Sequence, residues 1–124
     1  MKKNKILVVI PARGGSKRIP KKNIKKIGNI PMIGWPIKTL LKIFKKNQIL
    51  ISTDDKKIKK VCENFGLKIP FFRPKRLSGD KTGTIEVVHH ALNWFEKNFF
   101  LVDYVLIVYP TAIFLKSEDI KSAI

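Results

Sequence analysis

Short apolar runs alternate along this chain with stretches of helical periodicity, and this alternation constrains the fold more than any other feature. The runs are rich in β-branched residues and predict strands at residues 5–10, 49–51, 68–72 and 102–109. Between them, apolar residues recur at i, i+3, i+4 and i+7: Ile37, Leu40, Leu41 and Phe44, then Ile58, Val61, Cys62 and Phe65, then Val88, Ala91, Leu92 and Phe95. Such alternation predicts a three-layer α/β/α, Rossmann-like fold with a mostly parallel sheet covered on both faces.

The predicted helix ends carry residues suited to capping. Asp54 or Asp55 precedes the helix around Ile58, and Gly66 follows it as a C-terminal glycine should. Thr84 and Ser117 are predicted to be the N-caps of the last two helices, because their hydroxyls can accept hydrogen bonds from the first turn.

Composition sets the outer limits of the interpretation. A length of 124 residues with 44% hydrophobic content excludes a disordered chain and predicts one domain with a real core, residues 1–124. The 26 basic and 9 acidic residues give a net charge of +17, which indicates an anionic partner: a nucleic acid, a membrane surface or a phosphorylated metabolite. Charge alone does not choose among these, since most of the lysines are expected on solvated helix faces.

Cysteine usage and hydropathy bear on location. Cys62 is the single cysteine, so no intrachain disulfide can form, and its place on an apolar stripe predicts a core residue rather than a nucleophile. The apolar run near the N-terminus is too short to span a bilayer and lacks a secretory cleavage pattern. We therefore expect a cytoplasmic protein without a membrane partner.

The first predicted strand runs directly into a basic loop, residues 10–23, which reads IPARGGSKRIPKKN. Gly14 and Gly15 lack a Cβ, so backbone N–H groups there can approach an anion closely, and Ser16 adds a hydroxyl. The loop also holds five cations: Arg13, Lys17, Arg18, Lys21 and Lys22. Its spacing fits neither of the two best known phosphate-loop patterns, so it is a different kind of phosphate site or simply a basic turn.

Other polar stretches follow the later strands. Residues 52–55 (STDD) and 109–112 (YPTA) come after two of the predicted strands, and residues 73–83 form a further polar loop. In open parallel sheets, ligands bind beyond the carboxyl ends of the strands. We therefore expect the basic loop and the two stretches after the strands to converge on one rim.

These segments together resemble a known family. The segments that carry the resemblance are Ile10 to Pro20 with Lys22-Asn23, residues 52–55, Phe72-Arg73-Pro74, residues 77–84 and residues 109–112. In order and content they are similar to segments of the cytidylyltransferases that activate nonulosonic (sialic-type) acids, and most similar to those of the pseudaminic acid enzymes. The resemblance covers nearly the whole chain. It implies a nucleotide-diphospho-sugar-transferase-like fold and an enzyme that joins CTP to a nonulosonic acid, giving a CMP-sugar and pyrophosphate.

The resemblance also implies roles for particular residues. Arg13 and Lys22 are the catalytic cations on the triphosphate, and the other phosphate-binding residues are Gly14, Gly15, Ser16, Lys17 and Asn23. The residues expected around the base and ribose are Ala12, Arg73, Thr82, Thr84, Pro110 and Thr111. Arg73 and the two threonines suit cytosine, which presents acceptors at O2 and N3 and a donor at N4.

Two departures from the family pattern leave questions open. The run Tyr109-Pro110-Thr111-Ala112-Ile113 is closer to the tyrosine-containing form of this motif in the pseudaminic acid enzymes than to the Gln-Pro-Thr-Ser-Pro of many sialic acid synthetases, but it lacks the proline usual at the last position. Neuraminic, legionaminic and deoxyoctulosonic acid therefore remain alternative substrates. The resemblance implies that the Mg²⁺ expected for the reaction is held by an aspartate pair outside this segment, and nothing within it has the carboxylate spacing that would hold the ion. We therefore expect the N-terminal part of a longer enzyme, inactive by itself, with homodimerisation left open.

A function of another class, a basic nucleic-acid-binding module, has support from the net charge. It lacks a stacking platform, since Phe71, Phe72, Trp94 and Phe95 are expected at core or edge positions. His89 and His90 are adjacent on a helix, so they point in different directions and are not expected to share a metal. We expect no specific nucleic-acid partner.

Overall fold

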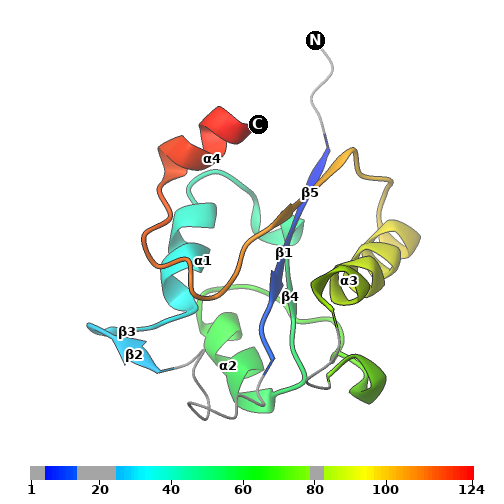
Figure 1. Cartoon of the computed structure of the whole chain (residues 1–124), viewed down its shortest axis with the longest axis horizontal. Coiled ribbons are helices and arrows are strands. Elements are labelled where there is room, and N and C mark those ends of the chain that lie inside the picture. The colour runs from blue at the N-terminus through cyan, green and yellow to red at the C-terminus, as the bar shows by residue number, and fades with distance from the viewer. Residues whose placement is uncertain (1–4, 14–24, 79–82) are drawn as a thin grey trace.

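The computed structural model describes residues 5–13, 25–78 and 83–124 (Figure 1). Its central strand β1 (Ile6–Pro11) lies between β4 (Ile49–Ser52) and β5 (Tyr104–Ile107), and both neighbours run parallel to it. Val8 pairs with Ile49 on one side and with Leu106 on the other. The predicted parallel sheet is confirmed.

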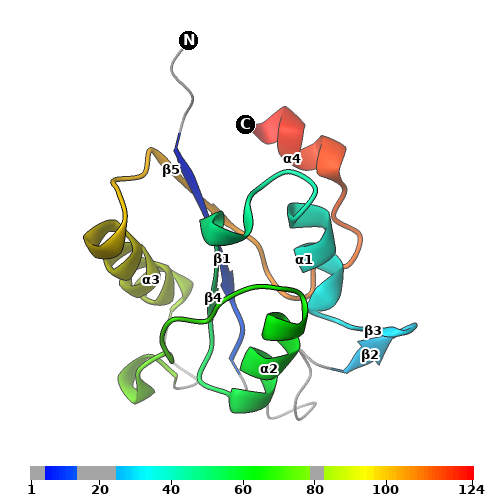
Figure 2. The ribbon, with the colours of Figure 1, turned by 180° about the vertical axis from the view of Figure 1, so that it is seen from behind.

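Helices cover both faces of this sheet. α1 (Gly34–Leu40), α2 (Lys56–Asn64) and α4 (Ser117–Ala123) lie on one side, and α3 (Thr84–Asn98) lies on the other (Figures 1 and 2). β1 is buried from Ile6 to Ile10 because its alternate side chains enter two separate cores. The three-layer prediction is therefore confirmed. No helix in the described part of the chain is long and apolar enough to cross a membrane.

The ends of α2 form as predicted. Asp55 is the N-cap, and its Oδ1 accepts hydrogen bonds from the backbone N–H groups of Lys57 (2.7 Å) and Ile58 (3.2 Å). Gly66, with φ of +87°, ends the helix in the left-handed conformation that favours glycine.

The predicted caps of the last two helices are wrong by one residue. Gly83 and Lys116 occupy the N-cap positions of α3 and α4, and neither makes a side-chain capping bond. Thr84 and Ser117 are instead the first helical residues. The hydroxyl of Thr84 meets the Tyr109 hydroxyl at 3.4 Å, so a tertiary contact occupies the group expected to cap the helix.

The predicted strand at residues 68–72 is also wrong. Leu67 and Ile69 are buried while Lys68 and Pro70 are exposed, so the period-two pattern is real. The segment is nevertheless irregular and joins no sheet among the described residues. Pro70 has no N–H to donate to a ladder, which explains why the buried pattern is not accompanied by strand pairing.

The last predicted strand, residues 102–109, is shorter in the structure, where β5 spans Tyr104–Ile107. β5 lies at the edge of the described sheet, and its first and last residues are exposed. β4 lies at the opposite edge, yet its four residues are 5% exposed or less. Only one of the two edges is therefore covered.

A small antiparallel hairpin was not predicted. β2 (Lys26–Ile27) and β3 (Ile30–Pro31) pair around a turn at Gly28, whose φ is +69°. The Nε1 of Trp35 donates a hydrogen bond to the carbonyl of Ile27 at 3.0 Å and ties the hairpin to α1. Strands of two residues are too short to show the alternating pattern from which strands are predicted.

Phe95 provides a test of the smaller core, which lies between the sheet and α3. Its side chain is 1% exposed and packs near the rings of Phe99 and Phe100. We expect Phe95→Ala to lower the free energy of unfolding by about 3 to 5 kcal/mol, through lost burial and the cavity left behind. The measurement is urea unfolding followed by circular dichroism.

The matched control is Phe114→Ala, because Phe114 is 86% exposed. Its effect should be less than about 0.5 kcal/mol. Similar losses for the two variants would contradict the assignment of Phe95 to the core.

Candidate functional site

The carboxyl ends of the three parallel strands meet at one rim of the sheet. Ala12, just after β1, is fully buried, and its N–H donates to the carbonyl of Ser52 at the end of β4 (2.8 Å). On the other side, the N–H of Val108 donates to the carbonyl of Val9 (3.1 Å). The predicted convergence is therefore confirmed for the described residues that follow each strand.

Arg73 reaches this rim from the loop that precedes α3 and is 6% exposed. Its Nε donates to Ser52 Oγ (3.1 Å) and one terminal nitrogen donates to the Ser52 carbonyl (2.8 Å). Its backbone N–H also donates to the carbonyl of Thr53 (2.7 Å). The plane and position of the guanidinium are thus set by buried backbone and hydroxyl groups of β4.

Charged groups gather around Arg73. Burial lowers the pKa of its guanidinium, the carboxylate of Asp54 opposes that change, and the positive charge of Arg13 lowers the pKa further. Arginine keeps its proton in proteins despite such shifts. Two cations, Arg13 and Arg73, and the carboxylate of Asp54 therefore share this rim.

The loop after β5 forms another part of the rim. Tyr109 is exposed, Pro110 is buried and Thr111 is exposed. The 3.4 Å contact between the Tyr109 and Thr84 hydroxyls brings the start of α3 to this loop. Arg73 and Thr84, which are 11 positions apart, thus both contact the rim: Arg73 at the last residue of β4 and Thr84 at the loop after β5.

Several predicted site residues fall outside the described residues. These are Gly14, Gly15, Ser16, Lys17, Lys22, Asn23 and Thr82. Their roles stay predictions, as do the ligand contacts of Ala12, Arg13, Arg73, Thr84, Pro110 and Thr111, whose positions are described above.

The described residues do not fit a Mg²⁺ site. They contain no group of three His, Cys, Asp or Glu side chains that could hold a metal ion. Asp55 is committed to capping α2, as expected, and Asp54 lies within the field of Arg73. No chemical step is assigned to a metal held by these residues.

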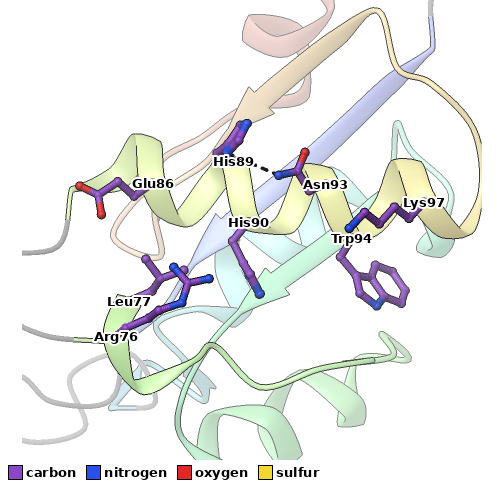
Figure 3. A pocket seen from close by; sticks show the side chains of 8 residues that line it. All are labelled: Arg76, Leu77, Glu86, His89, His90, Asn93, Trp94 and Lys97. Carbon is purple, nitrogen blue, oxygen red and sulfur yellow. Dashed lines mark hydrogen bonds between the residues drawn. The ribbon is translucent and has the colours of Figure 1, made fainter.

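A pocket of about 480 Å³ lies on the outer face of α3, between that helix and the short 3₁₀ helix Lys75–Leu77 (Figure 3). Its lining residues are Arg76, Leu77, Glu86, His89, His90, Asn93, Trp94 and Lys97. Sequence analysis missed it. The available signal was the i, i+4, i+7 spacing of His90, Trp94 and Lys97, which places polar and aromatic groups on one helix face.

The two histidines of α3 diverge, as predicted. His89 Nδ1 lies 3.5 Å from the Asn93 amide, whereas the His90 ring packs edge-on against Phe71 at 5.0 Å (Figure 3). His90 Nδ1 is buried and has no hydrogen-bond partner among the described groups. Burial, and then the charges of Arg76 and Arg73, lower the pKa of His90, so its ring is neutral at neutral pH.

Cys62 is a core residue, as predicted. Its side chain is fully buried between α2 and the sheet. Burial, with a smaller contribution from the Glu63 carboxylate, raises the pKa of the thiol to about 12. A thiol that stays protonated is a poor nucleophile, so the site chemistry does not involve Cys62.

The chain belongs to the cytidylyltransferase family, whose sequence profile matches residues 7–124. The matched range includes the rim residues described above. It also includes residues 14–24 and 79–82, which contain the other predicted site residues.

Among the curated relatives, the chain is 38% identical over 119 residues to pseudaminic acid cytidylyltransferase of Campylobacter jejuni, covering 96% of this chain and 51% of that protein. It is 37% identical over 120 residues to CMP-N,N'-diacetyllegionaminic acid synthase of Legionella pneumophila, covering 97% of this chain and 52% of that protein. The chain thus spans about half the length of these relatives.

The solved structures support the fold. The structure of CMP:2-keto-3-deoxy-manno-octonic acid synthetase complexed with CTP aligns with a TM-score of 0.77 at 22% identity, over 95% of this chain and 45% of that one. A cytidylyltransferase from Leptospira borgpetersenii aligns with a TM-score of 0.71 at 19% identity, over 97% of this chain and 47% of that one.

The Arg73–Ser52 contacts yield a prediction. Arg73→Ala should lower the free energy of unfolding by about 1.5 to 3 kcal/mol, because hydrogen bonds from a charged donor are lost at a buried carbonyl and hydroxyl. Ser52→Ala, which removes only the contact to Nε, should be less damaging. Urea unfolding gives both values.

The control for this pair is Lys75→Ala in the same loop, where the side chain is exposed. It should leave the unfolding curve nearly unchanged. If Arg73→Ala behaved like this control, Arg73 would not hold the end of β4.

A second prediction concerns the thiol. Because a pKa of about 12 keeps Cys62 protonated at pH 8, Ellman's reagent should label the native chain far more slowly than the chain unfolded in guanidinium. Because the pKa is raised, the folded chain binds the thiol proton more tightly than the unfolded chain does. The contribution of Cys62 to the free energy of unfolding therefore declines only as the pH rises above the pKa that the thiol has in the unfolded chain. Rapid stoichiometric labelling of the native chain would contradict the buried assignment.

Proposed function

We propose that this chain supplies the CTP-binding half of a cytidylyltransferase that activates a nonulosonic acid, with pseudaminic acid favoured. The observation that carries the proposal is the convergence of Arg13 and Arg73 at the carboxyl rim of a parallel sheet, in a chain that belongs to the cytidylyltransferase family. Ligands of open α/β sheets bind at this rim.

The proposed reaction transfers a cytidylyl group. The anomeric hydroxyl oxygen of the sugar forms a bond to the α-phosphorus of CTP and gives up its proton. The bond between the α-phosphorus and the bridging oxygen breaks, and pyrophosphate leaves. Such a reaction depends on neutralising phosphate charge and aligning the reactants, rather than on a covalent enzyme intermediate.

The proposed phosphate ligands are the cations Arg13, Lys17 and Lys22, together with Gly14, Gly15, Ser16 and Asn23. Arg13 is the member of this set that the structure describes. Its position is consistent with the proposal, because its charge acts on Arg73 at the rim. Preorganised cations of this kind stabilise the charge that develops on phosphate oxygens.

The proposed base pocket comprises Arg73, Thr82 and Thr84, with Ala12, Pro110 and Thr111 nearby. The two hydrogen bonds to Ser52 hold the Arg73 guanidinium in one orientation, so a base that approached it would meet a preorganised donor. Cytosine O2 and N3 can accept from such a donor, whereas adenine offers a different edge.

The relatives support the preference for pseudaminic acid within the nonulosonic acids. The pseudaminic and legionaminic acid enzymes match at 38% and 37% identity, and an N-acylneuraminate cytidylyltransferase from Escherichia coli matches at 28%. Tyr109, exposed beside Thr84, is the described residue that bears most directly on this choice, because it belongs to the tyrosine-containing form of the motif.

Magnesium is the proposed cofactor, with its ligands outside the described residues. We also propose that the protein acts in the cytoplasm, which fits its single buried, reduced cysteine. Catalysis is proposed to need parts of the relatives that have no counterpart in these 124 residues.

Calorimetry with CTP and ATP tests the base pocket. CTP should bind more tightly, because both nucleotides carry the same triphosphate and differ at the base. Equal affinities for the two would remove the base-pocket assignment while leaving the phosphate site in place.

A variant distinguishes specific phosphate binding from non-specific electrostatic attraction by the net charge. Arg13→Ala should weaken CTP binding by about 1.5 to 3 kcal/mol, or roughly tenfold or more, because a charge-assisted contact is lost. Lys57→Ala, an exposed lysine of α2, removes the same charge and should have little effect. Equal small effects, with binding to random duplex DNA that falls steeply as salt rises, would favour the nucleic-acid-binding alternative.

A further inference from the structure

The pocket on α3 is separate from the rim, which is the proposed site for CTP. One of its walls is the outer face of α3, and the other is the 3₁₀ helix Lys75–Leu77 (Figure 3). This second wall closely follows Arg73, which bonds to the end of β4, so it comes from the β4 side of the sheet and not from the edge at β5. The pocket volume of about 480 Å³ lies within the range of small-molecule sites, about 300 to 1,000 Å³.

Positive charge predominates among the residues that line the pocket. Arg76 and Lys97 are cations, and Glu86 is the one carboxylate among the described lining residues. Lys97, in the last turn of α3, extends back along the helix toward His90, whereas the Glu86 carboxylate points away from both of them (Figure 3). The pocket therefore favours an anionic ligand.

His90 adds a hydrogen-bond donor to this pocket. Its ring extends from α3 into the space between Arg76 and Trp94 (Figure 3). Nδ1 is buried without a hydrogen-bond partner among the described groups, so a proton there would be an unsatisfied buried donor, which is rare in proteins. The neutral ring therefore carries its proton on Nε2, at the tip of the side chain, and offers that N–H to a ligand.

These donors suit a phosphate group better than a carboxylate. A guanidinium from one wall and an ammonium and an imidazole N–H from the other can donate to more than two oxygens. A phosphate monoester has three strong acceptor oxygens and a charge of about −1.5 to −2. The Asn93 amide and the apolar side chains of Leu77 and Trp94 line the rest of the pocket, which leaves room for an uncharged group attached to the phosphate.

We propose that this pocket binds a small phosphorylated metabolite, with its phosphate monoester held by Arg76, His90 and Lys97. The site does not depend on the proposed CTP site. Burial lowers the pKa of His90, and the charges of Arg76 and then Arg73 lower it further, so positive charge from the loop before α3 acts on this ring. A bound phosphate offsets that local excess of positive charge.

An NMR titration of the isotope-labelled chain at neutral pH and about 0.15 M salt tests the proposal. With glucose 6-phosphate as the probe, the indole N–H signal of Trp94 should shift and saturate. The indole of Trp35 is an internal control that should not move, because its Nε1 bonds to the carbonyl of Ile27 in the hairpin. Glucose should shift neither signal, and glucuronate, which carries a carboxylate on the same kind of ring, should bind at least about threefold more weakly.

Variants distinguish this site from general attraction to a basic chain. Lys97→Gln should raise the Kd for glucose 6-phosphate by about fivefold or more, because a charge-assisted contact is lost. His90→Phe, which keeps an aromatic ring and removes the N–H, should also raise it. The matched control is Lys60→Gln on α2, which removes the same charge from an exposed site across the sheet and should change the Kd by less than about twofold.

Arg13→Ala separates this proposal from the proposed CTP site. It is expected to weaken CTP binding and should leave the Trp94 titration unchanged, so either proposal can fail while the other stands. A Trp94 signal that does not respond to glucose 6-phosphate, equal binding of glucuronate, or equal effects of the Lys97 and Lys60 variants would overturn the phosphate site on α3.

Discussion

The carbonyl of Ser52 holds together the three segments from which the rim is built. It accepts hydrogen bonds from the N–H of Ala12, after β1, and from the guanidinium of Arg73, both at 2.8 Å. Ser52 is fully buried, so leaving this oxygen without donors would carry a desolvation penalty. The ends of β1 and β4 and the loop before α3 are consequently held in one arrangement.

This arrangement has an electrostatic consequence for function. Arg73 is 6% exposed and lies near a second arginine, Arg13, so the fold keeps two like charges close together at the end of a sheet. The Ser52 contacts and the Asp54 carboxylate partly offset the cost of doing so. A triphosphate or a nucleobase carbonyl would be a natural additional partner for such cations, which is why the rim rather than the pocket on α3 is the candidate site.

Sequence analysis succeeded where burial and periodicity agree. Local patterns predict the β1 run, the apolar stripes of α2 and α3, and the Asp55 cap, because each depends on neighbours within a few residues. The stripe predicted from Ile37 to Phe44 is only partly helical, since α1 ends at Leu40. It failed at residues 68–72, where alternating burial is produced by packing without a backbone ladder. The two-residue strands of the hairpin are too short to give a periodic signal. The pocket on α3 also needs Arg76 and Leu77, and the spacing of His90, Trp94 and Lys97 along the helix does not reveal that they lie there.

The sequence by itself determined the layer architecture, the parallel sheet and the family, because hydrophobic spacing and the order of the polar motifs are properties of the linear chain. Only the tertiary structure decided that Arg73 bonds to Ser52, 21 positions away, and that the Thr84 hydroxyl meets Tyr109 instead of capping α3. It also decided that β4 is covered while the equally apolar β5 is left exposed at the edge. Such outcomes depend on which distant segments pack against each group, and local patterns do not contain that information.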